Sequence, residues 1–189
     1  GERTSLLGEA STSFRVLPHD CDLNLHLNNA RYLSFMDLSR IYTTARSGLL
    51  LRLIGRGWLP VIDAQEISYL RQIAPGEKVH VVTELVGWTE SHFFFKHQFR
   101  SKRGTAAVSY DRGLFIAHRK VIPMKEVIRL VQPELESPPL PDEVLAFHAR
   151  AGNKRSRYRL VKNGARRVAA APVAGQARKP LRSLIGTYL

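Results

Sequence analysis

Residues 20–32 concentrate more side chains capable of chemistry than any other part of the chain. The stretch reads DCDLNLHLNNARY and holds two aspartates, three asparagines and one histidine. A carboxylate can attack a carbonyl carbon or take a proton from water, and the start of a helix offers N–H groups that can polarise a carbonyl oxygen. These residue types therefore predict an acyl-transfer site.

Two predicted elements position this polar stretch. The preceding FRVLP alternates like a short strand and stops at Pro18, and the following ARYLSFMDLSRIYTTARSG is typical of a helix over residues 29–47 that ends near Gly48. Asn28 or Asn29 suits the helix N-cap. The positive end of the helix dipole would then lie beside the polar loop, where it favours a developing negative charge.

Four further segments have the apolar patterns of strands, with only short breaks between them. They are residues 58–71, 78–87, 91–101 and 105–118. Turn residues such as Gly76 and Gly104 occupy the breaks, and short breaks predict antiparallel neighbours. Along the third segment, alternate residues from Phe93 to Phe99 share one face, which we expect to face the core. The opposite face, which carries Lys96 and Gln98, should be wetter.

Length and composition fit a single domain with an appendage. The chain has 189 residues, and its hydrophobic content of 44% is enough to bury a core. No run approaches the roughly 20 apolar residues of a transmembrane helix. The start shows no secretory signal pattern, and the single cysteine, Cys21, excludes an internal disulfide. We therefore expect a cytoplasmic protein.

The net charge of +13 is unevenly distributed. Residues 135–189 hold 11 basic and 3 acidic residues, and no acidic residue follows Glu143. This composition predicts poor packing. We expect an N-terminal extension over 1–12, a folded domain over 13–134, and a basic, partly disordered C-terminal extension over 135–189 that contains one short helix.

The predicted order of one strand, one long helix and four antiparallel strands is that of the hotdog fold, an α+β fold in which a curved antiparallel sheet wraps one long helix. The pattern D-x-D-x-N-x-H-x-N-N-x-x-Y over residues 20–32 resembles the signature of acyl thioesterases of the hydroxybenzoyl-CoA thioesterase class. Over residues 12–125 the chain most resembles the branch that includes thioesterase superfamily member 6. The resemblance implies hydrolysis of an acyl-CoA or acyl-ACP thioester to free acid and thiol, without cofactor or metal, by a homodimer or homotetramer.

The resemblance also implies roles for individual residues. Asp22 would act on the thioester as a direct nucleophile or as the general base for water, with Asn24 and His26 orienting that chemistry. The candidate substrate-binding residues of the motif are Asn28, Asn29 and Tyr32. Related plant acyl-ACP thioesterases use a further carboxylate from a second hotdog repeat, which this chain lacks. Glu66 is the candidate substitute for that carboxylate.

A basic cluster could bind the carrier of the acyl group. Arg100, Lys102 and Arg103 gather at the predicted hairpin between the third and fourth strand segments. Their charges could meet the phosphates of coenzyme A, and an ordinary solvated turn is the alternative.

Simpler interpretations of the motif also exist. Aspartate and asparagine favour turns and caps, so Asp20 and Asp22 could serve the loop alone. His19 and His26 are metal-ligand types, but zinc sites usually show tighter His or Cys pairs, so we predict no metal site. Cys21 lies between two aspartates, which disfavour its thiolate, and we predict that it is inert.

Two other functions are compatible with the sequence. The first is a non-catalytic hotdog protein that binds acyl thioesters but lacks a complete proton relay. The second is a dimeric scaffold whose basic extension binds polyanions such as an anionic membrane. The extension contains only Tyr158 and Tyr188 as aromatic residues, so we predict no specific nucleic-acid binding.

Overall fold

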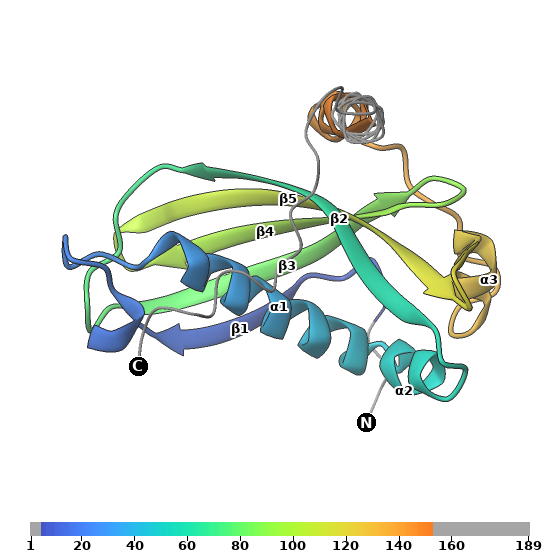
Figure 1. The fold of residues 1–189 in the computed structure, drawn as a ribbon, viewed down its shortest axis with the longest axis horizontal. Helices are drawn as coiled ribbons and strands as arrows, with labels where there is room; N and C mark the ends of the chain where they lie inside the picture. The colour runs from blue at the N-terminus through green and yellow to red at the C-terminus, as the bar shows by residue number, and fades with distance from the viewer. Residues whose placement is uncertain (1–4, 153–189) are drawn as a thin grey trace, which may run out of the picture. The chain divides into compact units, whose positions relative to one another are not determined.

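The computed structural model describes residues 5–152, and Figure 1 shows their fold. The helices are η1 (Pro18–Asp20), α1 (Asn29–Arg46), α2 (Leu49–Ile54) and α3 (Met124–Arg129). The strands are β1 (Ala10–Arg15), β2 (Leu59–Tyr69), β3 (Lys78–Trp88), β4 (Phe93–Ser101), β5 (Gly104–Ala117) and β6 (Lys120–Ile122). A further helical segment covers residues 142–152.

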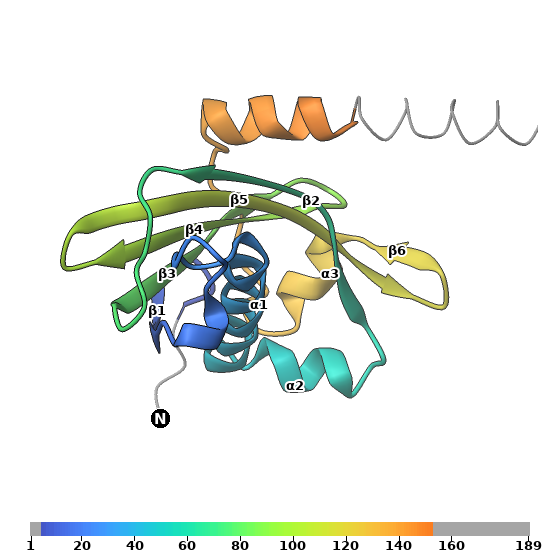
Figure 2. The ribbon, with the colours of Figure 1, turned by 60° about the vertical axis from the view of Figure 1, so that its left-hand side comes forward.

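The strands form one antiparallel sheet in the order β1-β3-β4-β5-β2, with β6 attached to β5. The sheet curves around α1, as Figures 1 and 2 both show. The predicted α+β architecture of a curved sheet around one long helix is therefore observed. The two edge strands are β1 and β2, and β2 is the longer of the two.

Local capping and burial explain α1. The side chain of Asn28 accepts a hydrogen bond from the Ala30 N–H at 2.9 Å, which caps the first turn. One face of the helix is buried against the sheet, and its large apolar members are Tyr32, Phe35 and Met36. The opposite face exposes apolar side chains, and these are Leu33, Leu38, Ile41 and Tyr42.

The β4 strand confirms the predicted core face, because Phe93, Phe95 and Phe99 are all buried. The opposite face of β4 is more buried from solvent than predicted. Phe94 is fully buried there, since Val144 and Phe147 of the helix at 142–152 pack against it. Burial of both faces accounts for the continuous apolar run at the start of β4.

The folded unit is larger than the expected range of 13–134. Strand β1 begins at Ala10, where Ser11 and Thr12 look like polar linker residues in the sequence but pair with Val82 and Val81 of β3. At the other end, the compact unit continues to Ala151. Apolar residues of the helix at 142–152, rather than its overall charge, decide that it packs on the sheet.

The short elements α2, α3 and β6 had no counterpart among the predicted elements. The rest of the expected basic extension, residues 153–189, lies outside the described residues. Within residues 5–152, no helix combines the length and the hydropathy that crossing a bilayer requires.

Candidate active site

The polar motif forms a tight loop between η1 and α1. Cys21 and Leu27 pair as an isolated antiparallel bridge, and Asp22 N–H donates to the His26 carbonyl at 2.9 Å. Leu25 turns the chain at a positive φ of 57°. The five residues from Asp22 to His26 are therefore held as a closed turn directly before the long helix.

Asp22 lies at the base of this turn and is exposed. Its Oδ1 accepts hydrogen bonds from the Asn24 N–H at 2.9 Å and from the His26 N–H at 3.4 Å. Among the described residues, no donor bonds to its Oδ2. One carboxylate oxygen therefore fixes the loop, and the other is available to a water molecule or a substrate.

A pocket of about 300 Å³ surrounds Asp22. Its walls come from the motif and from the end of β2, and the lining residues are Asp22, Asn24, His26, Leu27, Asn29, Tyr32, Tyr69, Leu70, Arg71 and Gln72. The structure thus brings together five of the predicted site residues, namely Asp22, Asn24, His26, Asn29 and Tyr32. The sixth motif residue, Asn28, serves as the N-cap of α1.

The start of α1 supplies one free N–H group to this pocket. The Ala30 N–H is taken by the Asn28 side chain and the Arg31 N–H by the Asn28 carbonyl. No acceptor among residues 5–152 bonds to the Asn29 N–H. Because Asn29 lines the pocket, its N–H can donate to an oxyanion that forms beside Asp22.

Asp20 has a different role from Asp22. Its side chain is 3% exposed, forms an ion pair with Arg31 at 2.6 Å and accepts the Leu17 N–H at 2.9 Å. Burial alone would raise the pKa of Asp20, but the Leu17 N–H and the Arg31 guanidinium outweigh it and lower the pKa. Asp20 therefore anchors the loop to α1.

Tyr32 forms the floor of the pocket. Its ring is 2% exposed and packs edge-on against Tyr69, with 5.0 Å between the ring centroids. Burial raises the pKa of Tyr32 to about 12, so its hydroxyl stays protonated and can donate a hydrogen bond.

Arg71 is a pocket residue that the sequence interpretation missed. It lies two residues after the end of β2, and its guanidinium donates to Ser101 Oγ at 2.6 Å and lies 3.6 Å from Glu77. No local pattern marks Arg71, because it lies 39 residues beyond Tyr32, the last residue of the motif. A hydrogen bond from the Leu27 N–H to the Ile73 carbonyl at 2.8 Å brings the two segments together.

The predicted basic cluster is only partly associated with this site. None of its three residues lines the Asp22 pocket. Arg103 forms an ion pair with Glu77 at 3.3 Å, Arg100 bonds to Gln98, and Lys102 is exposed. The β4–β5 hairpin that carries them contacts the pocket through the bond from Arg71 to Ser101.

Glu66 does not join Asp22. Its carboxylate lies 2.9 Å from the Arg150 guanidinium on the helix at 142–152, and it is absent from the pocket lining. The Cys21 thiol has a raised pKa because burial and the neighbouring Asp20 and Asp22 disfavour its thiolate. Within the described part of the chain, no three His, Cys, Asp or Glu side chains converge as metal ligands would.

Comparison with known proteins places this site in a family. A sequence model of the thioesterase-like superfamily matches residues 16–147, which include the Asp22 loop, α1 and the whole sheet from β2 to β6. The chain belongs to the thioesterase-like superfamily. The family predicted from the motif is therefore confirmed.

Curated relatives and a solved structure agree with this membership. Over 142 residues the chain is 33% identical to protein THEM6 of Xenopus laevis. This alignment covers 74% of this chain and 67% of that protein. It is 37% identical over 97 residues to protein THEM6 of Danio rerio, covering 51% of this chain and 48% of that one. The chain thus spans about half the length of the second relative.

The solved structure is that of a thioesterase from Thermus thermophilus, described as complexed with coenzyme A and zinc. It is 28% identical, covers 64% of this chain and 94% of that chain, and superposes with a TM-score of 0.57. The predicted hotdog fold is confirmed by this similarity.

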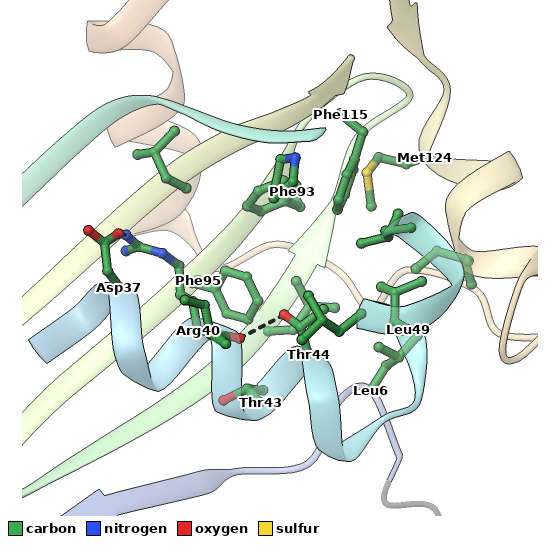
Figure 3. Close-up of a pocket in the computed structure, with 17 residues that line it drawn as sticks. Leu6, Asp37, Arg40, Thr43, Thr44, Leu49, Phe93, Phe95, Phe115 and Met124 are labelled. Atoms are coloured by element: carbon green, nitrogen blue, oxygen red, sulfur yellow. Dashed lines mark hydrogen bonds and ion pairs between the residues drawn. The ribbon is translucent and has the colours of Figure 1, made fainter. Parts of the chain in front are cut away.

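This thioesterase-family chain also encloses a second, apolar cavity of about 340 Å³. It lies between the C-terminal half of α1, α2, α3 and the sheet, and Figure 3 shows its lining. Phe93, Phe95 and Phe115 line it from the sheet, and Leu49 and Met124 from the helices. None of its lining residues also lines the Asp22 pocket.

A buried polar network borders this cavity. Arg40 bonds to Asp37 on its own helix and to Asp111 on β5, and Asp111 lies 3.1 Å from His97 Nε2. Burial lowers the pKa of His97, so the ring is neutral at pH 7 and donates Nε2–H to Asp111. Its Nδ1 accepts from the Thr83 hydroxyl at 2.8 Å. The network joins α1 to the sheet.

Proposed function

We propose that the chain hydrolyses an acyl thioester, carried by coenzyme A or an acyl carrier protein, to a free acid and a thiol. The observation that carries this proposal is the position of Asp22. Asp22 lines a pocket that Asn29, at the start of α1, also lines, and among the described residues neither Asp22 Oδ2 nor the Asn29 N–H has a hydrogen-bond partner. Membership of the thioesterase-like superfamily supports the same class of reaction.

The reaction follows from these groups. Asp22 Oδ2 accepts a proton from a water molecule as the water oxygen attacks the thioester carbon, and the carbonyl oxygen becomes an oxyanion. The Asn29 N–H stabilises that oxyanion together with the dipole of α1. When the carbon–sulfur bond breaks, the sulfur leaves with the bonding electron pair and takes the proton from Asp22. Asn24 shapes the loop, and His26 and Tyr32 contact the substrate.

Coenzyme A is the carrier that we favour. The Thermus thermophilus relative is described with coenzyme A bound, and the hairpin with Arg100, Lys102 and Arg103 adjoins the pocket through Arg71. Three exposed or half-exposed cations there suit the phosphates of the carrier.

The predicted cytoplasmic location stays a prediction.

The active unit that we propose is a homodimer joined through β2. This edge strand exposes apolar side chains along its length, including Leu59 at 61% and Tyr69 at 44%, followed by Leu70 at 63%. An exposed apolar edge of this kind favours pairing with a second copy. Sedimentation at micromolar concentration should show a species of twice the 21.4 kDa chain mass, and a lone 21.4 kDa species would contradict the dimer.

Two alternatives compete with hydrolysis. A non-catalytic binding protein is favoured because, among the residues that the structure describes, Asp22 is the single carboxylate that lines the pocket. A scaffold that acts through its basic extension depends on residues 153–189, outside the described part of the chain.

The deciding experiment measures thiol release from a panel of acyl-CoA thioesters, from aryl to long-chain. Hydrolysis of at least one class supports the proposal. Tight binding without thiol release would establish the binding protein instead. If the protein neither binds nor hydrolyses any of these thioesters, the scaffold function is the one that remains.

A further inference from the structure

We propose that the outer side of α2 and the turn after it bind the surface of an anionic phospholipid bilayer. The residues that make up this α2 face are Leu51, Arg52, Ile54, Arg56 and Trp58. The inference goes beyond the proposed function and does not rest on it, because it concerns the surface to which the protein binds and not the bond that it hydrolyses.

The apolar part of the α2 face consists of two large side chains that point into solvent. Leu51 is 78% exposed and Ile54 is 65% exposed, whereas Leu49 and Leu53 of the same helix are buried in the core. Positions 51 and 54 are three residues apart and therefore lie on one side of the helix. The core accounts for the inner leucines of α2 but not for the outer pair. Large apolar side chains grouped on a surface and bordered by polar residues mark an interaction site.

The position of α2 suits a broad, deformable partner. Figures 1 and 2 show α2 at the periphery of the folded unit, beyond the end of α1. Neither Leu51 nor Ile54 lines the Asp22 pocket or the apolar cavity behind the helix, so both side chains project from the surface. A protein partner would need a groove shaped to receive them. The boundary between lipid headgroups and acyl chains accepts projecting apolar side chains without such a groove.

The charge around these side chains is complementary to anionic lipid. Residues 38–62, which include all of α2, contain four arginines and no acidic residue. One of the four, Arg40, is engaged by two aspartates. Among residues 5–152, no carboxylate forms an ion pair with Arg52 or Arg56. Arginines beside exposed apolar side chains attract a negatively charged bilayer and hold the apolar groups against it.

Two arginine–aromatic pairs flank α2 in the chain. The Arg46 guanidinium lies 5.7 Å from the centre of the Tyr42 ring, and the Arg56 guanidinium lies 5.9 Å from the centre of the Trp58 ring. Tryptophan and tyrosine concentrate where headgroups meet hydrocarbon, because one end of each side chain is apolar and the other is polar. The α2 region therefore combines the three residue types of an interfacial helix, which are aliphatic, aromatic and basic.

Quenching of Trp58 fluorescence by brominated acyl chains tests contact at this particular place. The protein has two tryptophans, so Trp88→Phe in the full chain leaves Trp58 as the only emitter. Vesicles made of equal amounts of phosphatidylcholine and phosphatidylserine with brominated chains should quench Trp58 and shift its emission to shorter wavelength. The matched control is Trp58→Phe, in which Trp88 at the end of β3 should not be quenched. Vesicle binding that leaves Trp58 unquenched would overturn the proposal.

Substitutions on the α2 face test both parts of the interaction in the full chain. Leu51→Glu combined with Ile54→Glu should weaken binding to these vesicles by about 100-fold or more, because two large apolar side chains lose their burial. Arg52→Gln combined with Arg56→Gln should weaken it by about 10-fold or more. Leu145→Glu is the control, since Leu145 is exposed on the helix at 142–152 and its replacement should change the affinity little.

The remaining outcomes distinguish the rival occupants. Residues 153–189 are identical in every variant, so vesicle binding that none of the α2 substitutions weakens would place the lipid contact elsewhere and overturn the proposal. Absence of vesicle binding by the wild type would overturn it as well. Sedimentation without vesicles tests whether a second copy covers the α2 face: dissociation of the Leu51→Glu, Ile54→Glu variant would refute lipid docking, and unchanged sedimentation supports it.

These measurements are independent of the proposed function because none of them uses a thioester. A protein that binds vesicles through Trp58 but releases no thiol would refute hydrolysis and leave the docking surface in place. A protein that hydrolyses acyl-CoA but does not bind the vesicles would refute the docking surface alone.

Discussion

Replacement of Asp22 by asparagine is the most direct test of the catalytic assignment. Asparagine has nearly the same shape, and its Oδ1 can still accept the Asn24 and His26 N–H groups that hold the turn. What Asp22→Asn removes is the negative charge and the proton affinity of the free oxygen. The structure therefore predicts loss of chemistry without loss of fold.

The magnitude follows from the role of a general base. Removing such a group costs about 100- to 10,000-fold in rate, or about 3–5 kcal/mol of transition-state stabilisation. The free energy of unfolding should change by less than about 0.5 kcal/mol, because Asp22 is exposed and forms no ion pair among the described residues. Thiol release under saturating and limiting acyl-CoA, together with urea unfolding, measures both quantities.

Asp20→Asn provides the matched control. Asp20 is buried and paired with Arg31, so its replacement should cost about 1–3 kcal/mol of stability and leave kcat of the folded protein close to wild type. Wild-type turnover in Asp22→Asn would refute the assignment. A larger loss of kcat in folded Asp20→Asn would show that the motif has been read in the wrong register.

Three further predictions concern stability. Asp111→Asn should destabilise the fold by about 3–5 kcal/mol in urea, because it leaves the nearly buried charge of Arg40 without its β5 partner. Deleting residues 153–189 should leave the melting temperature unchanged, whereas deleting 135–189 should lower it by about 10 °C, since the latter also removes the large buried side chains of Val144 and Phe147, together worth about 3–6 kcal/mol. The lowered pKa of Asp20 makes its contribution to stability complete at pH values above 3.8, its ordinary pKa, and lost as the pH falls through the lower pKa of the folded state. Acid unfolding followed by circular dichroism should therefore occur over a narrower pH change in wild type than in Asp20→Asn.

Much of the fold could be predicted because its signals are local. Alternating apolar residues located β2 to β5 to within about two residues at most ends, and the Asn28 cap located the start of α1. Local signals also defined the Asp22 turn, since its hydrogen bonds join residues no more than five apart. The polar loop predicted from the motif and the turn observed in the structure therefore occupy the same residues.

Features created by tertiary contacts could not be predicted in this way. Tyr69 and Arg71 reach the pocket because the segment after β2 lies against the motif, where the Leu27 N–H bonds to the Ile73 carbonyl. No spacing in the sequence indicates this contact. The burial of Phe94 depends on a helix some fifty residues later in the chain. The charge distribution predicted that this helix belongs to a poorly packed extension. That prediction failed because a few buried apolar residues outweigh many exposed charges in deciding whether a helix packs on the sheet.

The pairing of the acidic residues bears on how Asp22 acts. Glu66 is engaged by Arg150, Glu77 by Arg71 and Arg103, and Asp20 by Arg31. Within the part of the chain that the structure describes, Asp22 is the one carboxylate that lines its pocket. If Asp22 attacked the thioester itself, the resulting anhydride would need a second base to activate water. We therefore expect Asp22 to act as the general base for direct attack by water.

Single-turnover hydrolysis in water enriched in heavy oxygen distinguishes the two pathways. Direct attack puts the heavy oxygen only into the released acid, and the peptide that contains Asp22 keeps its normal mass. An anhydride opened by water at the aspartyl carbon would leave heavy oxygen on Asp22. An anhydride opened at the acyl carbon leaves none there, but hydroxylamine would trap it as an aspartyl hydroxamate. A heavy or hydroxamate-modified Asp22 peptide in mass spectrometry would refute the general-base role, because each product requires a bond between Asp22 and the acyl group.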